Sequence, residues 1–132
     1  MSVSDPIADG LTKIRNASRA KHPSVDVAPS RQLERILQVL KDEGFIRTYR
    51  AAGEEKTQRV FRVYLKYVKK IPAITQLIRM SKPGVRVYRK AAELPRVLNG
   101  LGVAVVSTSK GVMAEREAYR QHIGGELMCY VW

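Results

Sequence analysis

The chain has 132 residues, 45% of them apolar, which is enough to fold around a core and excludes a disordered tail. Lys and Arg number 24 against 12 Asp and Glu, a net charge of +12. Small folded proteins this basic usually bind a polyanion, and nucleic acid is the first candidate; a merely basic soluble surface is the alternative.

Positive charge is present in both halves of the chain. Residues 1–70 carry 15 basic and 8 acidic side chains, a net of +7, and residues 71–132 carry 9 and 4, a net of +5. Both halves are therefore able to contact the same polyanion.

Cysteine usage and hydropathy favour a cytoplasmic protein. The single cysteine, Cys129, lies in the apolar run 127–132, where it lacks a partner for an internal disulfide or a zinc cluster. We expect it to be a small buried core residue. The first ten residues show no basic stretch followed by an apolar one, and no apolar run approaches the roughly 20 residues that cross a bilayer. We expect neither a signal peptide nor a membrane partner.

Helix caps and spacing predict two helices in the N-terminal half. Asp5-Pro6 is typical of a helix start, and the apolar residues that follow it fall on one side of a helix: Ile7, Leu11 and Ile14. Ser30 caps a second amphipathic segment that ends at Gly44. A short strand is expected between them, at residues 24–27.

Residues 45–50 and 57–67 predict a β-hairpin around a turn at 53–56. In its second strand Phe61, Val63, Leu65 and Tyr67 should point one way and Arg62 and Lys66 the other.

The C-terminal half is richer in short strands. Residues 81–84 predict a turn and residues 93–98 a short helical turn that ends at Asn99-Gly100. A helix is expected at 115–122. Strands are expected at four places: 75–80, 86–90, 102–106 and 126–132. The chain therefore predicts an α+β fold of two small lobes, residues 1–70 and residues 71–132.

Three hydroxyls, a lysine and a glycine end the buried strand of the second lobe. Ser107, Thr108, Ser109, Lys110 and Gly111 follow one another in the sequence. Short hydroxyls donate to phosphate and ribose oxygens, lysine supplies charge, and glycine permits close backbone approach. The alternative is a turn whose hydroxyls satisfy its own backbone.

Catalysis by this cluster is disfavoured. The only histidines, His22 and His122, lie in no recognisable nucleophile motif, and neither a G-x-S-x-G elbow nor an S-x-x-K spacing is present. The phosphate-binding loop pattern and metal-ligand spacings are also missing. We expect no cofactor, no metal and no small-molecule substrate. A hydrolase that uses Ser109 and a DNA-binding architectural protein are the rival hypotheses.

Two further features fit binding. Tyr88 lies among Arg86, Arg89 and Lys90, where its ring could stack on a base or ribose; a half-buried strand aromatic is the alternative. Gly124-Gly125-Glu126 predicts a tight turn with a carboxylate that accepts from a base edge or pairs with a nearby arginine.

Four groups of motifs run along nearly the whole chain. VVSTSKGVM is followed by a helical segment, GGE and CYVW. Together these resemble the C-terminal signature of the bacterial small-subunit ribosomal protein number eight family. The remaining motifs resemble its start, its second helix end and its middle: DPIADGLTKIRNA, KDEGFI, KPGVRVY and ELPRVLNGLG.

The resemblance implies a protein that binds the central domain of 16S rRNA, helps assemble the small subunit and contacts neighbouring small-subunit proteins. It places Ser107, Thr108 and Ser109 in the RNA-contacting loop and matches Tyr88 and Glu126 to the same surface. It also implies that three residues of the N-terminal helix contact a further part of the RNA: Thr12, Arg15 and Asn16. On the residues alone, a solvated helix face is an equal alternative for these three.

Some family members repress translation of their own operon through a messenger that mimics the rRNA site; the sequence does not decide this for the present chain, nor does it distinguish a bacterial from an organellar ribosome. One departure from the family concerns the helix after Met113. Ala114 stands where the family usually has threonine or serine, a natural N-cap, so this helix is expected to start without a side-chain cap.

Overall fold

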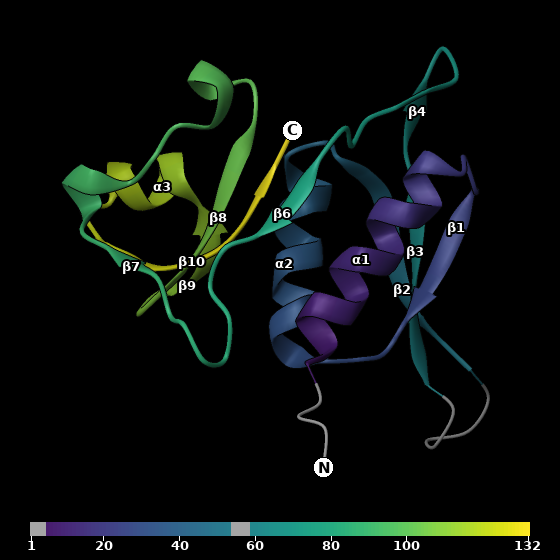
Figure 1. The fold of residues 1–132 in the computed structure, drawn as a ribbon, viewed down its shortest axis with the longest axis horizontal. Coiled ribbons are helices and arrows are strands. Elements are labelled where there is room, and N and C mark those ends of the chain that lie inside the picture. Colours follow the sequence, from purple (N-terminus) through teal and green to yellow (C-terminus); the bar gives the residue numbers. More distant parts are fainter. Residues whose placement is uncertain (1–4, 54–58) are drawn as a thin grey trace. The chain divides into compact units, whose positions relative to one another are not determined.

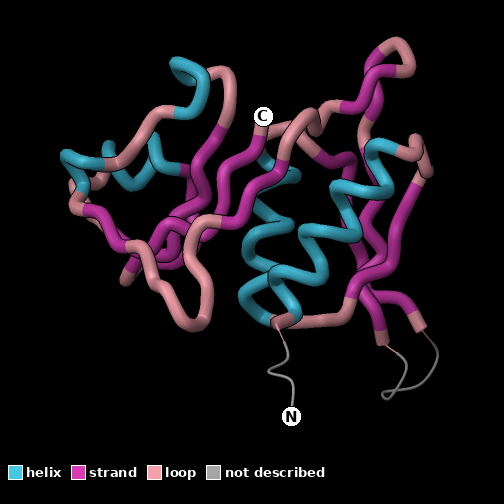
Figure 2. The backbone as a smooth tube through the Cα atoms, in the orientation of Figure 1, coloured by secondary structure: helices cyan, strands magenta, loops and turns pink. Residues whose placement is uncertain are grey.

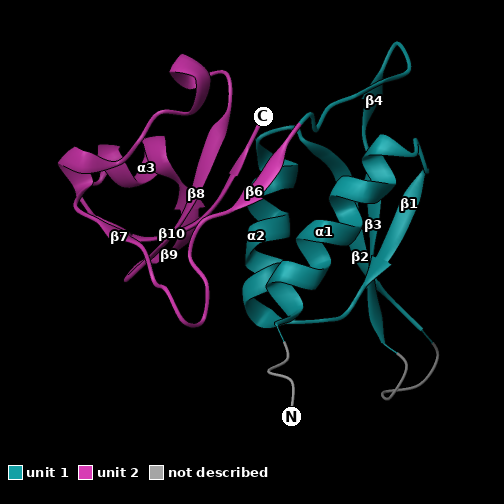
Figure 3. Cartoon of the chain, viewed as in Figure 1, with its two compact units in different colours: residues 1–75 teal, residues 76–132 magenta. Residues whose placement is uncertain are grey.

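The computed structural model describes residues 5–53 and 59–132 and has the predicted α+β class, with helices and antiparallel sheets (Figure 1). The chain divides into two compact units, residues 1–75 and 76–132 (Figure 3). Among the described residues, no helix combines the length and the apolar character that a membrane span requires.

Both helices of the first unit begin where their capping residues predict. Helix α1 covers Pro6–Arg19, and the Asp5 carboxylate accepts a hydrogen bond from the Ala8 amide at 3.2 Å. Helix α2 covers Arg31–Asp42, and the Ser30 hydroxyl accepts from the Leu33 amide at 3.4 Å. Each cap satisfies an amide that the helix itself leaves without a partner.

The first unit holds a three-stranded antiparallel sheet. Strands β1 (Ser24–Val27), β3 (Val60–Leu65) and β2 (Ile46–Ala52) lie side by side in that order. The helices cover one face of this sheet (Figure 1). The core contains apolar side chains of both helices and all three strands: Leu11, Ile14, Leu33, Ile36, Leu37, Leu40, Val27, Ile46, Val63 and Leu65.

The alternation predicted for the second strand of the hairpin, residues 57–67, is confirmed for Val63 and Leu65, which are buried, but not for Tyr67. Strand β3 ends at Leu65, and Tyr67–Val68 form a separate strand, β4, which pairs with β5 at Ile71–Pro72 (Figure 2). The turn predicted at 53–56 lies, beyond Gly53, outside the described residues.

A mixed set of short elements makes up the second unit. Its sheet has the order β6-β10-β8-β9, with β7 also paired to β10. The strands are β6 (Leu77–Arg79), β7 (Tyr88–Arg89), β8 (Val103–Thr108), β9 (Gly111–Ala114) and β10 (Gly125–Val131). Helix α3 covers Glu115–Arg120, and two 3-10 turns, η2 and η3, cover Ala91–Glu93 and Val97–Gly100.

One core cluster of this unit is formed by Val97, Ala104, Val106 and Leu127, with partly buried apolar side chains around them. Cys129 is buried as predicted, and burial raises the pKa of its thiol to about 12. Burial of this kind disfavours the thiolate, which is the reactive form of cysteine.

Two predicted elements of the second unit are wrong in part. The helical turn expected at 93–98 is interrupted at 94–96, between η2 and η3. Leu94 and Arg96 have extended backbone on either side of Pro95, and a residue before proline is disfavoured in the helical region. The strand expected at 86–90 is reduced to Tyr88–Arg89. The Val87 amide donates to the Ser81 hydroxyl at 3.2 Å rather than to a neighbouring strand.

Helix α3 begins without a side-chain cap, as the departure at position 114 predicts. Ala114 occupies the N-cap position with extended backbone, φ −70° and ψ 151°, and no side-chain hydrogen bond closes the first turn. This geometry is the one a capping serine adopts.

We therefore expect Ala114→Ser to raise the free energy of unfolding of the second unit by about 1 kcal/mol, because its hydroxyl would accept from an unsatisfied helix amide. Urea unfolding followed by the fluorescence of Trp132, the only tryptophan, reports on this unit. Ser30→Ala, followed by far-UV circular dichroism, should lower the free energy of unfolding because it removes an existing cap. An Ala114→Ser protein no more stable than the parent would contradict the assignment.

Candidate nucleic-acid interface

The hydroxyl cluster forms the end of a β-hairpin rather than a free loop. Ser107 and Thr108 are the last residues of β8 and pair with Val112 and Gly111 of β9, which was not predicted. Ser109 and Lys110 make the two-residue turn, where both are exposed. Gly111 follows with φ +118°, a conformation that favours glycine.

The three hydroxyls are not equivalent. The Thr108 hydroxyl donates to the Gly111 carbonyl at 2.7 Å and accepts from the Lys110 amide at 3.1 Å. For Thr108 the alternative interpretation therefore applies: its hydroxyl satisfies the backbone of its own turn. Neither Ser107 nor Ser109 makes a side-chain hydrogen bond to another residue in the described part of the chain. Their hydroxyls remain available to a ligand.

Strand pairing places residues of four strands in one row. Tyr88 of β7 lies opposite Glu126 of β10, Glu126 lies opposite Ser107 of β8, and Ser107 lies opposite Val112 of β9. Directly opposed residues share a face of the sheet, and neighbouring strands are about 4.8 Å apart. Tyr88, Glu126 and Ser107 therefore stand side by side, while Val106 and Leu127 point to the core on the other face.

The tight turn predicted at 124–126 is wrong. The two glycines beside this row instead allow neighbouring backbones to pack closely. A Cβ on Gly125 would lie 2.2 Å from the Ser107 carbonyl oxygen. A Cβ on Gly124 would lie 2.3 Å from the Arg89 carbonyl oxygen. Gly125 and Glu126 belong to β10, and the absence of side chains at 124 and 125 lets the backbones of β7 and β8 approach it.

Glu126 forms the arginine pair that the sequence left as an alternative. Its carboxylate Oε2 accepts from Arg86 Nη1 at 3.0 Å and from the Ser81 hydroxyl. The side chain of Glu126 is only 12% exposed, whereas that of Arg86 is 46% exposed. Among the described residues, both hydrogen bonds of this carboxylate fall on Oε2.

Ser81 is a positioning residue that sequence reasoning missed. It is fully buried, and its hydroxyl links Glu126 to the Val87 amide. Its carbonyl accepts from Arg79 Nε at 2.5 Å, and its amide donates to the Leu127 carbonyl at 3.0 Å. The only signal in the sequence was a serine before the Lys-Pro-Gly turn, a residue type that is usually assigned to the turn itself.

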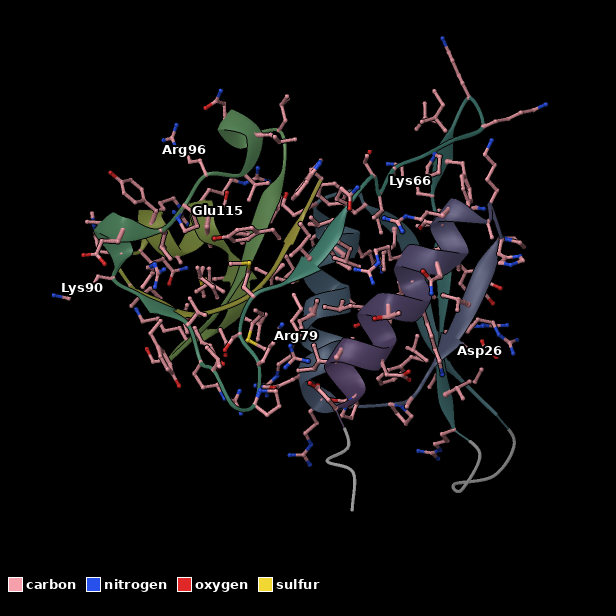
Figure 4. All side chains as sticks on the ribbon, viewed as in Figure 1. Asp26, Lys66, Arg79, Lys90, Arg96 and Glu115 are labelled. Atoms are coloured by element: carbon pink, nitrogen blue, oxygen red, sulfur yellow. The ribbon has the colours of Figure 1, made fainter. Side chains whose placement is uncertain are left out.

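Tyr88 is 64% exposed, so it is not a core aromatic. It borders a shallow pocket of about 480 Å³ whose lining includes Arg89, Lys90, Gly124 and Gly125. Lys90 extends outward from this part of the chain (Figure 4). Glu93 also lines this pocket, so its rim carries charges of both signs, and the exposed ring of Tyr88 offers a face for stacking.

The residues expected on the N-terminal helix form a separate group in the first unit. Thr12 and Asn16 are exposed on α1 and Arg15 is half-buried, and their spacing places them on one side of the helix. The opposite side carries the buried residues Ile7, Leu11 and Ile14.

The fold and the site define a small, strongly basic α+β protein with a candidate polyanion-binding surface. No described His, Cys, Asp or Glu residues cluster as a metal site, and neither free serine contacts a base. The sequence model described as ribosomal protein S8 matches residues 5–132.

Curated relatives cover the whole chain. Proteins named small ribosomal subunit protein uS8 are 50% identical in Chloroflexus aurantiacus, over 133 residues, and 52% identical in Dictyoglomus thermophilum, over 132 residues. The protein of that name in Halalkalibacterium halodurans is 52% identical. In each case 100% of both chains is covered. The chain belongs to the ribosomal protein S8 family, whose members are ribosome components and not enzymes.

We expect Ser81→Ala to destabilise the second unit by about 1–3 kcal/mol, because it leaves the Val87 amide and the Glu126 carboxylate without a buried partner. The measurement is urea unfolding followed by Trp132 fluorescence. Ser109→Ala is the matched control: it is exposed and lacks a described hydrogen bond, so its effect should stay within about 0.5 kcal/mol. Equal effects of the two substitutions would contradict a bridging role for Ser81.

Proposed function

We propose that this chain is a structural protein of the small ribosomal subunit that binds the central domain of 16S rRNA directly and assists subunit assembly. The observation that carries the proposal is the row of Tyr88, Glu126 and Ser107 beside the exposed Ser109-Lys110 turn. Family membership and the names of the relatives support the ribosomal part. On this proposal the protein resides in the small subunit and contacts neighbouring subunit proteins.

The chemistry of the row suits structured RNA. Tyr88 offers a face for stacking on a splayed base, a contact worth about 1–3 kcal/mol per base. The hydroxyls of Ser107 and Ser109 both donate and accept, so they match the ribose 2′-OH, which distinguishes RNA from DNA. Lys110, Arg89 and Lys90 would supply the attraction for phosphates.

Glu126 has a positioning role in this proposal. Its carboxylate pairs with Arg86 and is itself held by buried Ser81. A binding surface held in this way loses little side-chain entropy when the ligand arrives. Thr12, Arg15 and Asn16 on α1 are proposed as a second point of contact. A messenger that imitates the rRNA site would use the same surface, so autorepression would be lost with rRNA binding.

The first test is competition binding of the purified protein to a folded central-domain fragment of 16S rRNA, at two salt concentrations. We expect tight binding that survives an excess of duplex DNA and of scrambled RNA, because shape and 2′-OH contacts add to the charge. Binding that either competitor abolishes would reduce the protein to a general polyanion binder and would refute the proposal.

Ser109→Ala should weaken binding to the specific fragment about three- to tenfold, the loss expected for one hydrogen bond. The slope of log affinity against log salt should stay unchanged, since no charge is removed. Lys110→Ala, next to it on the same turn, is the matched control and should lower that slope by about 0.7–0.9. An affinity unaffected by Ser109→Ala would remove this turn from the interface.

A further inference from the structure

At finer scale the charge of the chain is very uneven. Residues 56–92 contain 11 basic side chains and no acidic one. The other 95 residues contain 13 basic and 12 acidic side chains, a net of +1. Nearly all of the net charge therefore comes from one segment, which includes Tyr88 and also strands β4 and β5 of the first unit.

Strands β4 and β5 form a short hairpin, residues 67–72, which we call the arm. Tyr67 pairs with Pro72 and Val68 with Ile71, so the turn consists of Lys69 and Lys70 alone. Both lysines have positive φ, 51° and 66°. Two-residue turns with positive φ at both positions strongly favour Asn-Gly, yet here both positions carry lysine.

The arm is fixed at its base and exposed at its tip. The Tyr67 hydroxyl donates to the His22 carbonyl, and the Ala73 amide donates to the Lys66 carbonyl at 2.9 Å. Lys66 stands at the junction between the arm and β3 (Figure 4). From there the arm projects beyond the sheet and helices of the first unit (Figure 2). It is a preformed element that need not order on binding.

Apolar side chains next to the lysines are exposed. Val68 is 57% and Ile71 67% exposed, and because they are paired they share one face of the arm. At the base, a hollow of about 420 Å³ is lined in part by Arg47 and Lys66. Within the described part of the chain, none of these lysines nor Arg47 forms an ion pair with a carboxylate.

We infer that the arm is a second RNA-binding element, which lies in the shallow minor groove of an RNA helix. Lys69 and Lys70 bind phosphates at the groove edge, and Val68 and Ile71 contact the ribose faces. The inference rests on the proposed rRNA binding and adds a site in the first unit. The minor groove of RNA is wide and shallow enough to admit protein elements and is recognised by shape.

The charge of the segment favours RNA over a protein partner. A stable protein interface needs about 800 Å² of surface from each partner, with an apolar centre. The arm offers two apolar side chains, at a turn occupied by two lysines. A segment of 37 residues without one carboxylate matches a phosphate backbone, which carries one negative charge at every nucleotide.

The test removes the charge and keeps the turn. Lys69→Asn/Lys70→Gly installs the preferred sequence for this turn, so the arm should remain folded. The matched control, Lys21→Asn/Lys41→Gln, removes two exposed lysines elsewhere in the first unit, and Asn tolerates the positive φ of 59° at position 21. Both proteins are titrated with the central-domain 16S rRNA fragment over a range of salt concentrations.

We expect the arm variant to bind about tenfold more weakly at 0.1 M salt, with the slope against log salt reduced by about 1.5, as for the loss of two phosphate contacts. The control should change neither the affinity nor the salt slope by more than a small fraction of these amounts. If the arm variant has the same affinity and salt slope as its control while the parent binds specifically, the inference about the arm is overturned and the proposed function still stands. Failure of the parent to bind would refute the proposed function itself.

A second measurement locates the contact. Val68→Cys places one exposed thiol on the arm, and buried Cys129 does not compete for the label. An iron chelate attached there should cleave the bound rRNA fragment at two short stretches across a minor groove. Cleavage no stronger than that from a chelate at Lys41→Cys on α2 would show that the arm points away from RNA and would overturn the inference.

Discussion

The candidate interface depends on how closely three backbones approach one another at the start of β10. Gly124 and Gly125 pass the carbonyl oxygens of Arg89 and Ser107 at distances that leave no room for a Cβ. This approach allows β10 to pair with both β7 and β8 at Glu126. Tyr88 and Ser107, which are 19 positions apart in the sequence, thereby become neighbours of one carboxylate. A side chain at position 125 would separate the strands and disperse the row.

A buried polar network also fixes this region. Ser81 is fully buried, and its hydroxyl connects the Val87 amide to Glu126, which in turn pairs with Arg86. Buried polar groups that are all satisfied fix a single arrangement, because any displacement leaves one of them without a partner. The segment between β6 and β7 is thus tied to β10, and the exposed side chains of Arg86 and Tyr88 are presented on a fixed backbone.

On the proposed binding of rRNA, attraction and fit would come from different residues of this protein. Lysines and arginines on residues 56–92 provide nearly all of the net charge, which acts over a Debye length and distinguishes little between polyanions. Hydroxyls, the tyrosine ring and close backbone contacts act only at a matched surface. Thr108 organises the hairpin turn, and this leaves the neighbouring hydroxyls of Ser107 and Ser109 for a ligand. The arm combines the two properties, since its charge sits on a turn of fixed geometry.

The sequence alone determined both N-terminal helices with their caps, the burial of Cys129, the uncapped start of α3 and the α+β class. Caps, helical periodicity and apolar runs depend on residues a few positions apart, so they can be recognised in the sequence. It also selected Tyr88, Glu126 and the hydroxyl cluster as candidates. Only the tertiary structure decided how they are arranged. The row of Tyr88, Glu126 and Ser107 and the roles of Ser81, Gly124 and Gly125 arise from pairing between distant segments. Strand register depends on such long-range contacts, which leave no local pattern for sequence reasoning to detect.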